Sequence, residues 1–343
     1  MLWQSSFSHS SARLIPGYGN GMQYIVAAYV LWGVFPAFFP LLDPASPLEI
    51  LAHRIIWTAV LMVGILLLTG RWREIYEVRA ATWWRLAAAG VVITVNWGTY
   101  VLAVMNDHVA DASLGYYMNP LVSVALGVLI LREHLRRWQM VAVAIAAVAV
   151  VYLTFLSGQP PVIALALAFS FGTYGLLKKK VAVSAFFSVG AETMIMLPFA
   201  LGYVAYISVN PEQQSTFASE GWGHTLLMMS CGLVTATPLL FYARGAHMLP
   251  LSTIGMLQYL TPTILMLWAL FITQEPMSQQ RWIGFIIIWV AVAVYVADLV
   301  RMRRHSRREQ RRQTVSFAGT GQREGSAPTE HEQCGRRTGD QHE

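Results

Sequence analysis

Residues 113–133 read SLGYYMNPLVSVALGVLILRE, and residues 255–275 read GMLQYLTPTILMLWALFITQE. The second stretch follows the first by 142 positions, and four of the 21 aligned residues are identical. Both stretches are apolar, carry a proline in their first half and end at a glutamate. A spaced, self-similar pair of this kind indicates an internal repeat. The identical pairs are Tyr117–Tyr259, Pro120–Pro262, Ile130–Ile272 and Glu133–Glu275.

The two stretches belong to a series of ten apolar runs. Hydrophobic residues make up 55% of the chain and charged residues only 12%, whereas soluble domains carry about 25% charged residues. Each run is long enough to cross a hydrocarbon core of about 30 Å as a helix. Backbone in lipid must satisfy its own hydrogen bonds, so we expect an all-α integral membrane protein with ten transmembrane helices. The runs are 22–42, 49–69, 83–104, 111–131, 137–156, 160–178, 186–207, 223–243, 250–272 and 281–300.

Basic residues alternate between successive loops and thereby predict an orientation. The loops near 43–48, 105–110, 157–159 and 208–222 contain no Lys or Arg, and Arg281 is the one exception on that side. The positive-inside rule places the basic loops and both termini in the cytoplasm. The basic loop and tail residues are Arg71, Arg73, Arg79, Arg132, Arg136, Arg137, Lys178, Lys179, Lys180, Arg244, Arg301, Arg303, Arg304, Arg307, Arg308, Arg311 and Arg312.

Orientation and repeat together predict two inverted halves. The first repeat stretch ends at Glu133 on the cytoplasmic side, whereas the second ends at Glu275 on the outer side. Each half holds five helices, an odd number, so the second half must be inverted relative to the first. We expect a cytoplasmic segment 1–21, a first five-helix repeat 22–156, a second repeat 160–300, and a basic, disordered cytoplasmic tail 301–343. The arginines of that tail are expected to lie against anionic lipid headgroups rather than to bind nucleic acid.

The sequence resembles the RarD-type proteins of the drug/metabolite transporter superfamily, the group that carries EamA repeats. The resemblance covers about residues 22–300 and implies a bacterial inner-membrane permease with inverted repeats that works by alternating access. At the ends of the two repeat stretches, Arg132-Glu133 and Gln274-Glu275 replace the Gly-Glu of many relatives, which leaves open whether a sharp turn forms there. The stretches that carry the resemblance are AAYVLWGVFPAFF, EILAHRIIW, NWGTYVLAV, DASLGYYMNPLV, LALAFSFGTYGLLKKK, ETMIMLP, TATPLL and GMLQYLTPT.

Three ionisable residues within the apolar runs are candidates for a role in transport, because a charged group inside a span costs about 2.5–3.5 kcal/mol. Arg54 either holds an anionic substrate group or extends outward to the headgroups. His53 either titrates near neutral pH or is a hydrogen-bonded structural residue. Glu192 is the candidate proton carrier, and its alternative is a packed carboxyl bonded to a neighbouring helix.

Neutral polar residues cluster near prolines in the middle of the runs. A proline inside a helix removes one backbone hydrogen bond and frees the carbonyl four residues earlier. The freed carbonyls and the nearby side chains either form a polar wall for a substrate or simply join kinked helices. We expect Pro120, Pro238 and Pro262 to be hinges. The candidate pathway residues are Asn96, Trp97, Tyr100, Tyr116, Tyr117, Asn119, Thr237, Gln258, Tyr259 and Thr261.

These patterns favour a secondary active transporter of a small metabolite or drug that uses no cofactor or metal. Its expected partners are the substrate, membrane lipids and a proton carried by Glu192. There is no Walker A motif, nucleophile elbow or Cys/His metal spacing, so no enzyme is expected. The alternative is a membrane enzyme or lipid-handling scaffold with an outer-face site near Asp107, His108 and Asp111. A channel is disfavoured because no filter motif is present.

Overall fold

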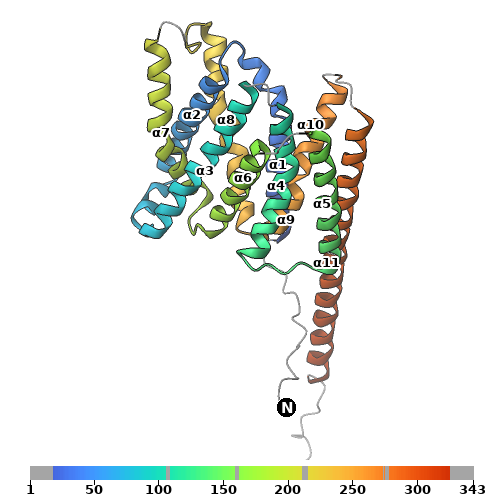
Figure 1. The fold of residues 1–343 in the computed structure, drawn as a ribbon. Coiled ribbons are helices and arrows are strands. Elements are labelled where there is room, and N and C mark those ends of the chain that lie inside the picture. Colours follow the sequence, from blue (N-terminus) through green and yellow to red (C-terminus); the bar gives the residue numbers. More distant parts are fainter. Residues whose placement is uncertain are drawn as a thin grey trace, which may run out of the picture. The chain divides into compact units, whose positions relative to one another are not determined.

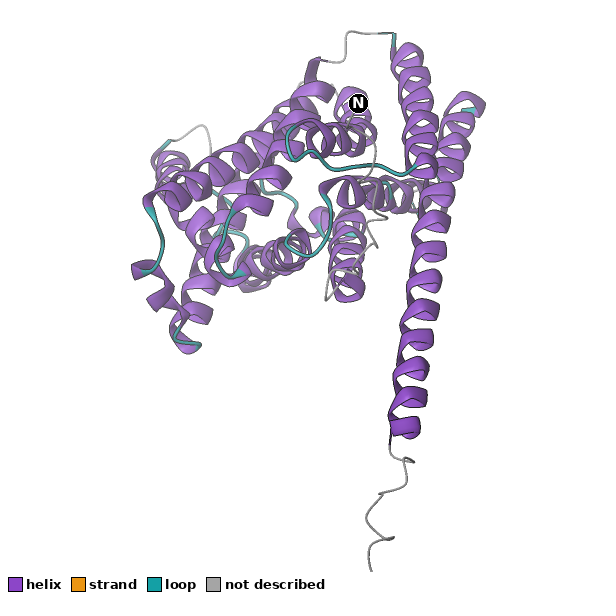
Figure 2. Cartoon of the chain, turned by 90° about the horizontal axis from the view of Figure 1, so that it is seen from below, coloured by secondary structure: helices purple, strands orange, loops and turns teal. Residues whose placement is uncertain are grey.

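The described part of the protein consists of helices joined by loops and turns, as the computed structural model shows (Figures 1 and 2). The structure describes residues 18–105, 109–158, 162–210, 215–272, 274 and 278–324. No strand occurs in these ranges. The α-helices are α1 (Tyr18–Gly33), α2 (Pro47–Leu68), α3 (Ala80–Met105), α4 (Val109–Leu129), α5 (Arg137–Ser157), α6 (Val162–Lys180), α7 (Ala185–Val209), α8 (Gly221–Ala246), α9 (Leu251–Gln258), α10 (Leu260–Phe271) and α11 (Gln279–Glu324). Short 3₁₀ helices are η1 (Phe35–Ala37), η2 (Phe39–Leu42) and η3 (Arg71–Tyr76).

The chain is a multi-pass membrane protein. Within the described ranges, seven helical segments are long and apolar enough to cross a bilayer. A shorter apolar helix covers Leu114–Leu129 within α4. The seven segments are Pro47–Leu68, Arg137–Leu156, Val162–Lys180, Ala185–Val209, Gly221–Ala246, Leu251–Phe271 and Gln279–Met302.

The first apolar run does not form one continuous helix. α1 ends at Gly33, and the rest of the run folds into the 3₁₀ turns η1 and η2. Pro36 and Pro40 lie in the first turns of these two elements. A proline ring cannot donate a backbone hydrogen bond and clashes with the preceding helical turn, so both residues oppose an α-helix through residue 42. The sequence contained this signal, because both prolines lie in the predicted helix.

The ninth run is also interrupted. α9 ends at Gln258, Tyr259 lies between the two helices, and α10 begins at Leu260. Pro262 has no N–H to donate to the carbonyl of Gln258, so the break lies where the missing hydrogen bond would have been. The interruption is confined to this one residue: Tyr259 keeps right-handed helical angles (φ −58°, ψ −14°), and the next helical bond, from Thr263 N–H to Tyr259 O, is present at 3.2 Å.

Residues 15–295 form one compact unit in which the two halves are interleaved (Figure 1). α4 packs against α6 and α9, while α2 packs against α7 and α8. α3 packs against α6 and α7, and α1 packs against α8 and α10. The repeat pairs α1 with α6, α2 with α7, α3 with α8, and α4 with α9 and α10. When each helix is replaced by its counterpart, the α1–α8 contact becomes α6–α3 and the α2–α8 contact becomes α7–α3. The α4–α6 contact becomes the contact of α9 and α10 with α1. All of these pairings occur.

Matching local features recur in the two halves. Ser46 caps α2 and Ser184 caps α7, and each hydroxyl accepts a hydrogen bond from the backbone N–H three residues later. Arg132 and Gln274, 142 positions apart, both have a positive φ, 55° and 53°. A left-handed turn, which glycine adopts most easily, therefore forms here at two side-chain-bearing residues.

The second unit comprises residues 1–14 and 296–343. Its described part is helical, because α11 continues to Glu324. The sequence predicted a disordered tail from residue 301, yet Arg, Gln and Glu are good helix formers when they follow an existing helix. Residues 325–343 lie outside the described ranges.

Candidate functional site

The crossing of α4 and α9 forms the middle of the candidate site. A Cβ atom added to Gly255 of α9 would lie 2.7 Å from the carbonyl oxygen of Pro120 of α4. Only a residue without a side chain allows the two backbones to approach this closely. Pro120 is buried within α4, which continues through it as a helix. The two stretches that revealed the repeat are therefore in direct contact.

Three buried polar atoms next to this crossing have no hydrogen-bond partner among the described residues. They are Asn119 Oδ1, Gln258 Oε1 and Tyr259 Oη. The three residues are 3%, 4% and 1% exposed. An unsatisfied buried polar group costs about 1–3 kcal/mol, so each of these atoms calls for a partner that the described residues do not supply.

Tyr29 of α1 joins both pieces of the interrupted helix. Its hydroxyl donates to Ile254 O of α9 at 3.1 Å, and its carbonyl accepts from Thr261 Oγ1 of α10 at 3.0 Å. Its ring belongs to a cluster of buried or half-buried aromatic rings that links α1, α6 and α8. The members of this aromatic cluster are Tyr29, Trp32, Phe171, Tyr174 and Tyr242, with ring centroids 5.6–6.2 Å apart.

Glu192 is one half of a buried ion pair that adjoins the aromatic cluster. Its Oε1 atom lies 2.6 Å from Nζ of Lys178, a lysine that is 0% exposed. Ser188 Oγ donates to the same carboxylate oxygen at 2.9 Å and accepts from Lys178 Nζ at 2.8 Å. Tyr174 Oη donates to Oε2 at 3.3 Å. The carboxylate thus lies between one cation and two hydroxyl groups, all on α6 and α7.

Sequence reasoning missed Lys178. It counted this residue with Lys179 and Lys180 as a loop charge, although α6 extends to Lys180 and the Lys178 side chain points into the protein. A signal was available: on a helix, Lys178 lies four residues after Tyr174, so the two share one face. The Lys178 ammonium lies 5.4 Å from the centre of the Tyr174 ring.

Arg54 contacts side chains of α3, α8 and the two 3₁₀ turns that follow α1. Its Nε donates to Thr235 Oγ1 of α8 at 3.0 Å, and its guanidinium carbon lies 4.5 Å from the centre of the Trp97 ring of α3. Phe35 and Phe39 lie at 5.8 and 5.6 Å. The guanidinium therefore has an aromatic surrounding and one hydrogen bond, and the residue is half-buried.

His53 faces a different neighbourhood. Its Nδ1 accepts from Trp57 Nε1 at 3.2 Å, its ring stacks on Phe217 with centroids 4.6 Å apart, and its buried Nε2 has no partner among the described residues. Glu49, one turn earlier on α2, accepts hydrogen bonds from Thr216 and Phe217 backbone N–H at 2.8 and 3.3 Å. These contacts fix the segment before α8 onto α2.

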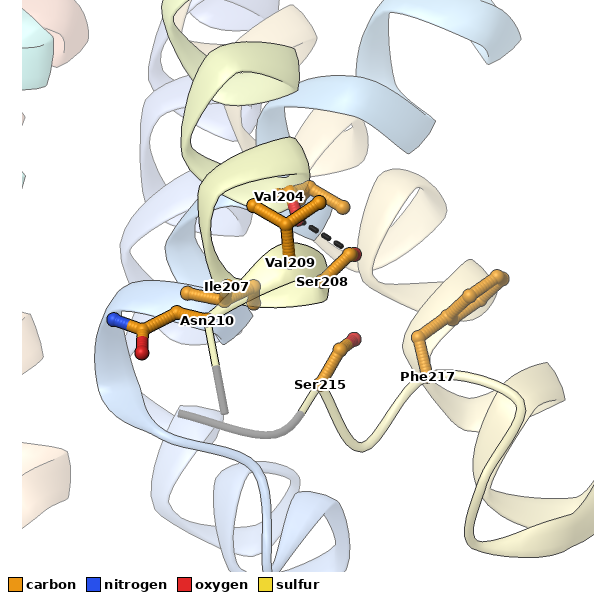
Figure 3. A pocket seen from close by; sticks show the side chains of 7 residues that line it. All are labelled: Val204, Ile207, Ser208, Val209, Asn210, Ser215 and Phe217. Carbon is orange, nitrogen blue, oxygen red and sulfur yellow. Dashed lines mark hydrogen bonds between the residues drawn. The ribbon is translucent and has the colours of Figure 1, made fainter. Parts of the chain in front are cut away.

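A pocket of about 500 Å³ lies beside this segment, at the end of α7. Figure 3 shows Ser208 donating back to Val204 O, with Ser215 and Phe217 on the segment that leads to α8. None of the predicted pathway residues lines this pocket. Its lining residues are Val204, Ile207, Ser208, Val209, Asn210, Ser215 and Phe217.

The remaining predicted pathway residues are divided among several contacts. Asn96 joins α3 to α6, because its amide donates to Leu167 O and Ser170 Oγ, each at 2.9 Å. Thr237, next to the buried Pro238 of α8, donates back to Leu233 O at 2.8 Å. Tyr100 and Tyr116 meet edge to face at 5.9 Å, while Tyr117 meets Phe285 of α11 at 5.4 Å.

The residues of the enzyme alternative lie largely outside the described part of the chain. Asp107 and His108 lie outside the described residues, and only the backbone of Asp111 is described, in the first turn of α4. Within the described ranges, no group of three or more His, Cys, Asp or Glu side chains is arranged to hold a metal ion.

Comparison with known proteins identifies the family. The model of the EamA-like transporter family matches twice, over residues 19–155 and 161–297. Protein RarD of Streptomyces exfoliatus is 46% identical over 84% of this chain and 91% of its own length. The uncharacterized transporter YojE of Bacillus subtilis is 41% identical over 84% of this chain and 97% of its own.

A solved crystal structure shares the fold at 17% identity, with a TM-score of 0.63 over 80% of this chain and 96% of that chain. Family and relatives agree with a membrane transporter rather than an enzyme. The chain belongs to the EamA-like transporter family of the drug/metabolite transporter superfamily, and it is a homologue of the RarD proteins.

Proposed function

We propose that the protein is a secondary active transporter that moves a small organic molecule across the bacterial inner membrane by alternating access. The observation that carries this proposal is the group of unsatisfied buried atoms of Asn119, Gln258 and Tyr259 at the α4–α9 crossing. Transporters of inverted-repeat architecture bind their substrates near the midplane, where interrupted helices expose polar groups. A substrate bound there would supply the missing hydrogen bonds.

We further propose ten transmembrane helices in two inverted repeats, at 22–156 and 160–300, with both termini in the cytoplasm and a basic cytoplasmic tail. The exchange of helix pairings between the halves supports this arrangement, as does the match of the family model to each half. The paired left-handed turns at Arg132 and Gln274 add local support. Alternating access then follows as a rocking of one repeat-related set of helices against the other.

The pair of Glu192 and Lys178 is our candidate for coupling transport to a proton. A proton delivered to Glu192 would neutralise the carboxylate and leave Lys178 as an uncompensated buried cation. Removing one partner of a buried ion pair costs about 3–5 kcal/mol, which is enough to shift an equilibrium between two conformations strongly. The aromatic cluster connects this pair, through Tyr174 and Tyr29, to the interrupted helix α9–α10.

Glu133 closes one end of the α4–α9 interface in this conformation. Its carboxylate accepts from the backbone N–H groups of Leu251 and Ser252 at 2.7 and 2.9 Å, at the start of α9. Lys179 Nζ lies 3.8 Å from the same carboxylate and donates to Leu249 O at 2.6 Å. These bonds must break when α4 and α9 separate, so we propose that they form the cytoplasmic gate.

Transport by purified protein in liposomes tests the proposal. The vesicles would carry an imposed pH gradient and be screened with labelled amino acids, nucleosides and antibiotics. We expect at least one compound to cross faster with the protein than without it. We also expect E192Q to abolish the gradient dependence, while E220Q, which changes an exposed acidic residue at the start of α8, leaves it intact. Equal flux in E192Q and unmodified protein would contradict the coupling role.

A further inference from the structure

The side chain of Arg54 has an unused set of hydrogen-bond donors. Its Nε donates to Thr235, but the two Nη groups make no hydrogen bond to any described residue. No acidic side chain within the described ranges forms an ion pair with it. An arginine keeps its charge at any physiological pH, so this is a permanent cation without a counter-ion among the described residues.

The corresponding position of the other half is built differently. Arg54 follows its helix cap, Ser46, by eight residues, and Glu192 follows its cap, Ser184, by the same number. Glu192 has its counter-ion inside the protein, because Lys178 lies at 2.6 Å. Arg54 has no such counter-ion in the described part of the chain, although the two residues occupy the same place in their repeats. An uncompensated charge in an apolar surrounding is costly and usually has a partner. No described residue is the partner of Arg54, so an anion from outside the chain can take this place.

The surrounding rings indicate which kind of anion fits. The guanidinium carbon of Arg54 lies over the Trp97 ring, 4.5 Å from its centre. The centres of the Phe35 and Phe39 rings also lie less than 6 Å from the guanidinium carbon. Tyr100 and Tyr116, in contact with each other, lie within electrostatic range of Arg54. A carboxylate matches the two-donor edge of a guanidinium, while rings recognise a flat apolar body.

We propose that Arg54 is the anchor of a binding site for an organic monoanion, namely a carboxylate attached to an aromatic or similarly flat apolar group. The single cation favours one negative charge over the two of a phosphate monoester. The carboxylate lies against the Nη edge of Arg54, and the ring lies among Trp97, Phe35 and Phe39. This inference rests on the proposed transport function, for which it names the class of substrate.

Calorimetric titration of the purified full-length protein with phenylacetate and indole-3-acetate tests the site. The corresponding neutral amides serve as isosteric probes without the charge. We expect both carboxylates to bind and both amides to bind far more weakly. In R54Q the affinity for the carboxylates should fall about 10- to 100-fold, because a charge-assisted bidentate contact is lost. R54K keeps the charge but not the fork, so its affinity should lie between those of R54Q and unmodified protein.

The matched control is R244Q. Arg244 also lies over an aromatic ring, that of Tyr24 at 5.4 Å, but it is exposed. R244Q should bind the carboxylates as tightly as the unmodified protein. If R54Q and R54K both bind the carboxylates with unchanged affinity, or if the amides bind as tightly as the acids, the inference is wrong.

Flux measurements separate this inference from the transport proposal. Binding that depends on Arg54, without movement of any carboxylate through liposomes, would support the site and contradict the transporter. Flux of a neutral substrate at the same rate in R54Q, with no carboxylate binding, would support the transporter and overturn the site. Arg54-dependent binding together with Arg54-dependent carboxylate flux would support both.

Discussion

Neutralising one member of the Lys178–Glu192 pair should destabilise the protein much more than neutralising both. The single variants are K178M and E192Q, and the double variant combines them. E192Q keeps an oxygen that accepts from Ser188 and Tyr174, so it removes the charge and little else. K178M keeps the aliphatic bulk of the lysine. Each single variant leaves a buried, uncompensated charge, whereas the double variant leaves none.

The expected magnitude follows from distance and burial. Two unit charges 2.6 Å apart attract by about 6 kcal/mol at an effective dielectric constant of 20. Desolvation of both groups offsets much of that gain, so the intact pair contributes little net stability. Breaking it is different: the loss for each single variant should be about 3–5 kcal/mol. The double variant should lose less free energy of unfolding than either single variant. The interaction energy from the double-mutant cycle should be more than about 2 kcal/mol.

Unfolding of purified protein in detergent, followed by intrinsic fluorescence, measures the four members of this cycle. E220Q again provides the control for loss of an acidic residue without loss of a buried partner. Additive effects, with the double variant as unstable as the sum of the two singles, would refute the reasoning, because residues that do not interact give additive changes. If the double variant is well folded, its transport can also be measured, which tests proton coupling without the complication of an unfolded protein.

Three further changes have clear expected outcomes. Arg132→Gly and Gln274→Gly should each raise the free energy of unfolding by up to about 1 kcal/mol, because glycine adopts a positive φ without strain. Denaturant titration measures this change. A lower free energy of unfolding in both variants would contradict the left-handed turns. Glu133→Gln should cost about 1.5–3 kcal/mol by weakening charge-assisted bonds to the start of α9, and hydrogen exchange there should speed up. Gly255→Ala places a methyl group against a backbone oxygen of α4 and should lower thermal stability by about 1–3 kcal/mol, whereas Gly202→Ala on α7, with open space around it, should not.

The positions of the helices were predictable from the sequence because hydropathy alone determines which segments can enter a bilayer. The all-helical class and the family resemblance are confirmed. The end of α1 at Gly33 depends on Pro36 and Pro40, whose local effect was outweighed by the run length in the prediction. At these two prolines the length of the apolar run predicted a continuous helix, whereas the missing N–H of proline predicted a break. The structure follows the proline. Pro262 was predicted as a hinge, and its missing hydrogen bond to Gln258 coincides with the gap between α9 and α10 at Tyr259.

Side-chain partners were much less predictable. The sequence drew attention to Glu192 as a charge inside an apolar run, but its partner Lys178 was assigned to a loop because lysines are normally solvated. The role of Tyr29 had no signal at all in the sequence, since its bonds reach residues more than 220 positions away. Pairings of this kind arise from the packing of helices. A single sequence, read by itself, does not specify this packing.

The capping of α9 by Glu133 has a consequence for how the protein is made. The first half leaves the ribosome before α9 exists, so Glu133 then lacks its backbone N–H partners, and Arg54 lacks the hydroxyl of Thr235. Until the later helices insert, the membrane-embedded first half holds polar groups without partners. Each half therefore completes the hydrogen bonding of the other. Two halves synthesised as separate chains in one cell should assemble into the working protein. Either half synthesised alone should be degraded.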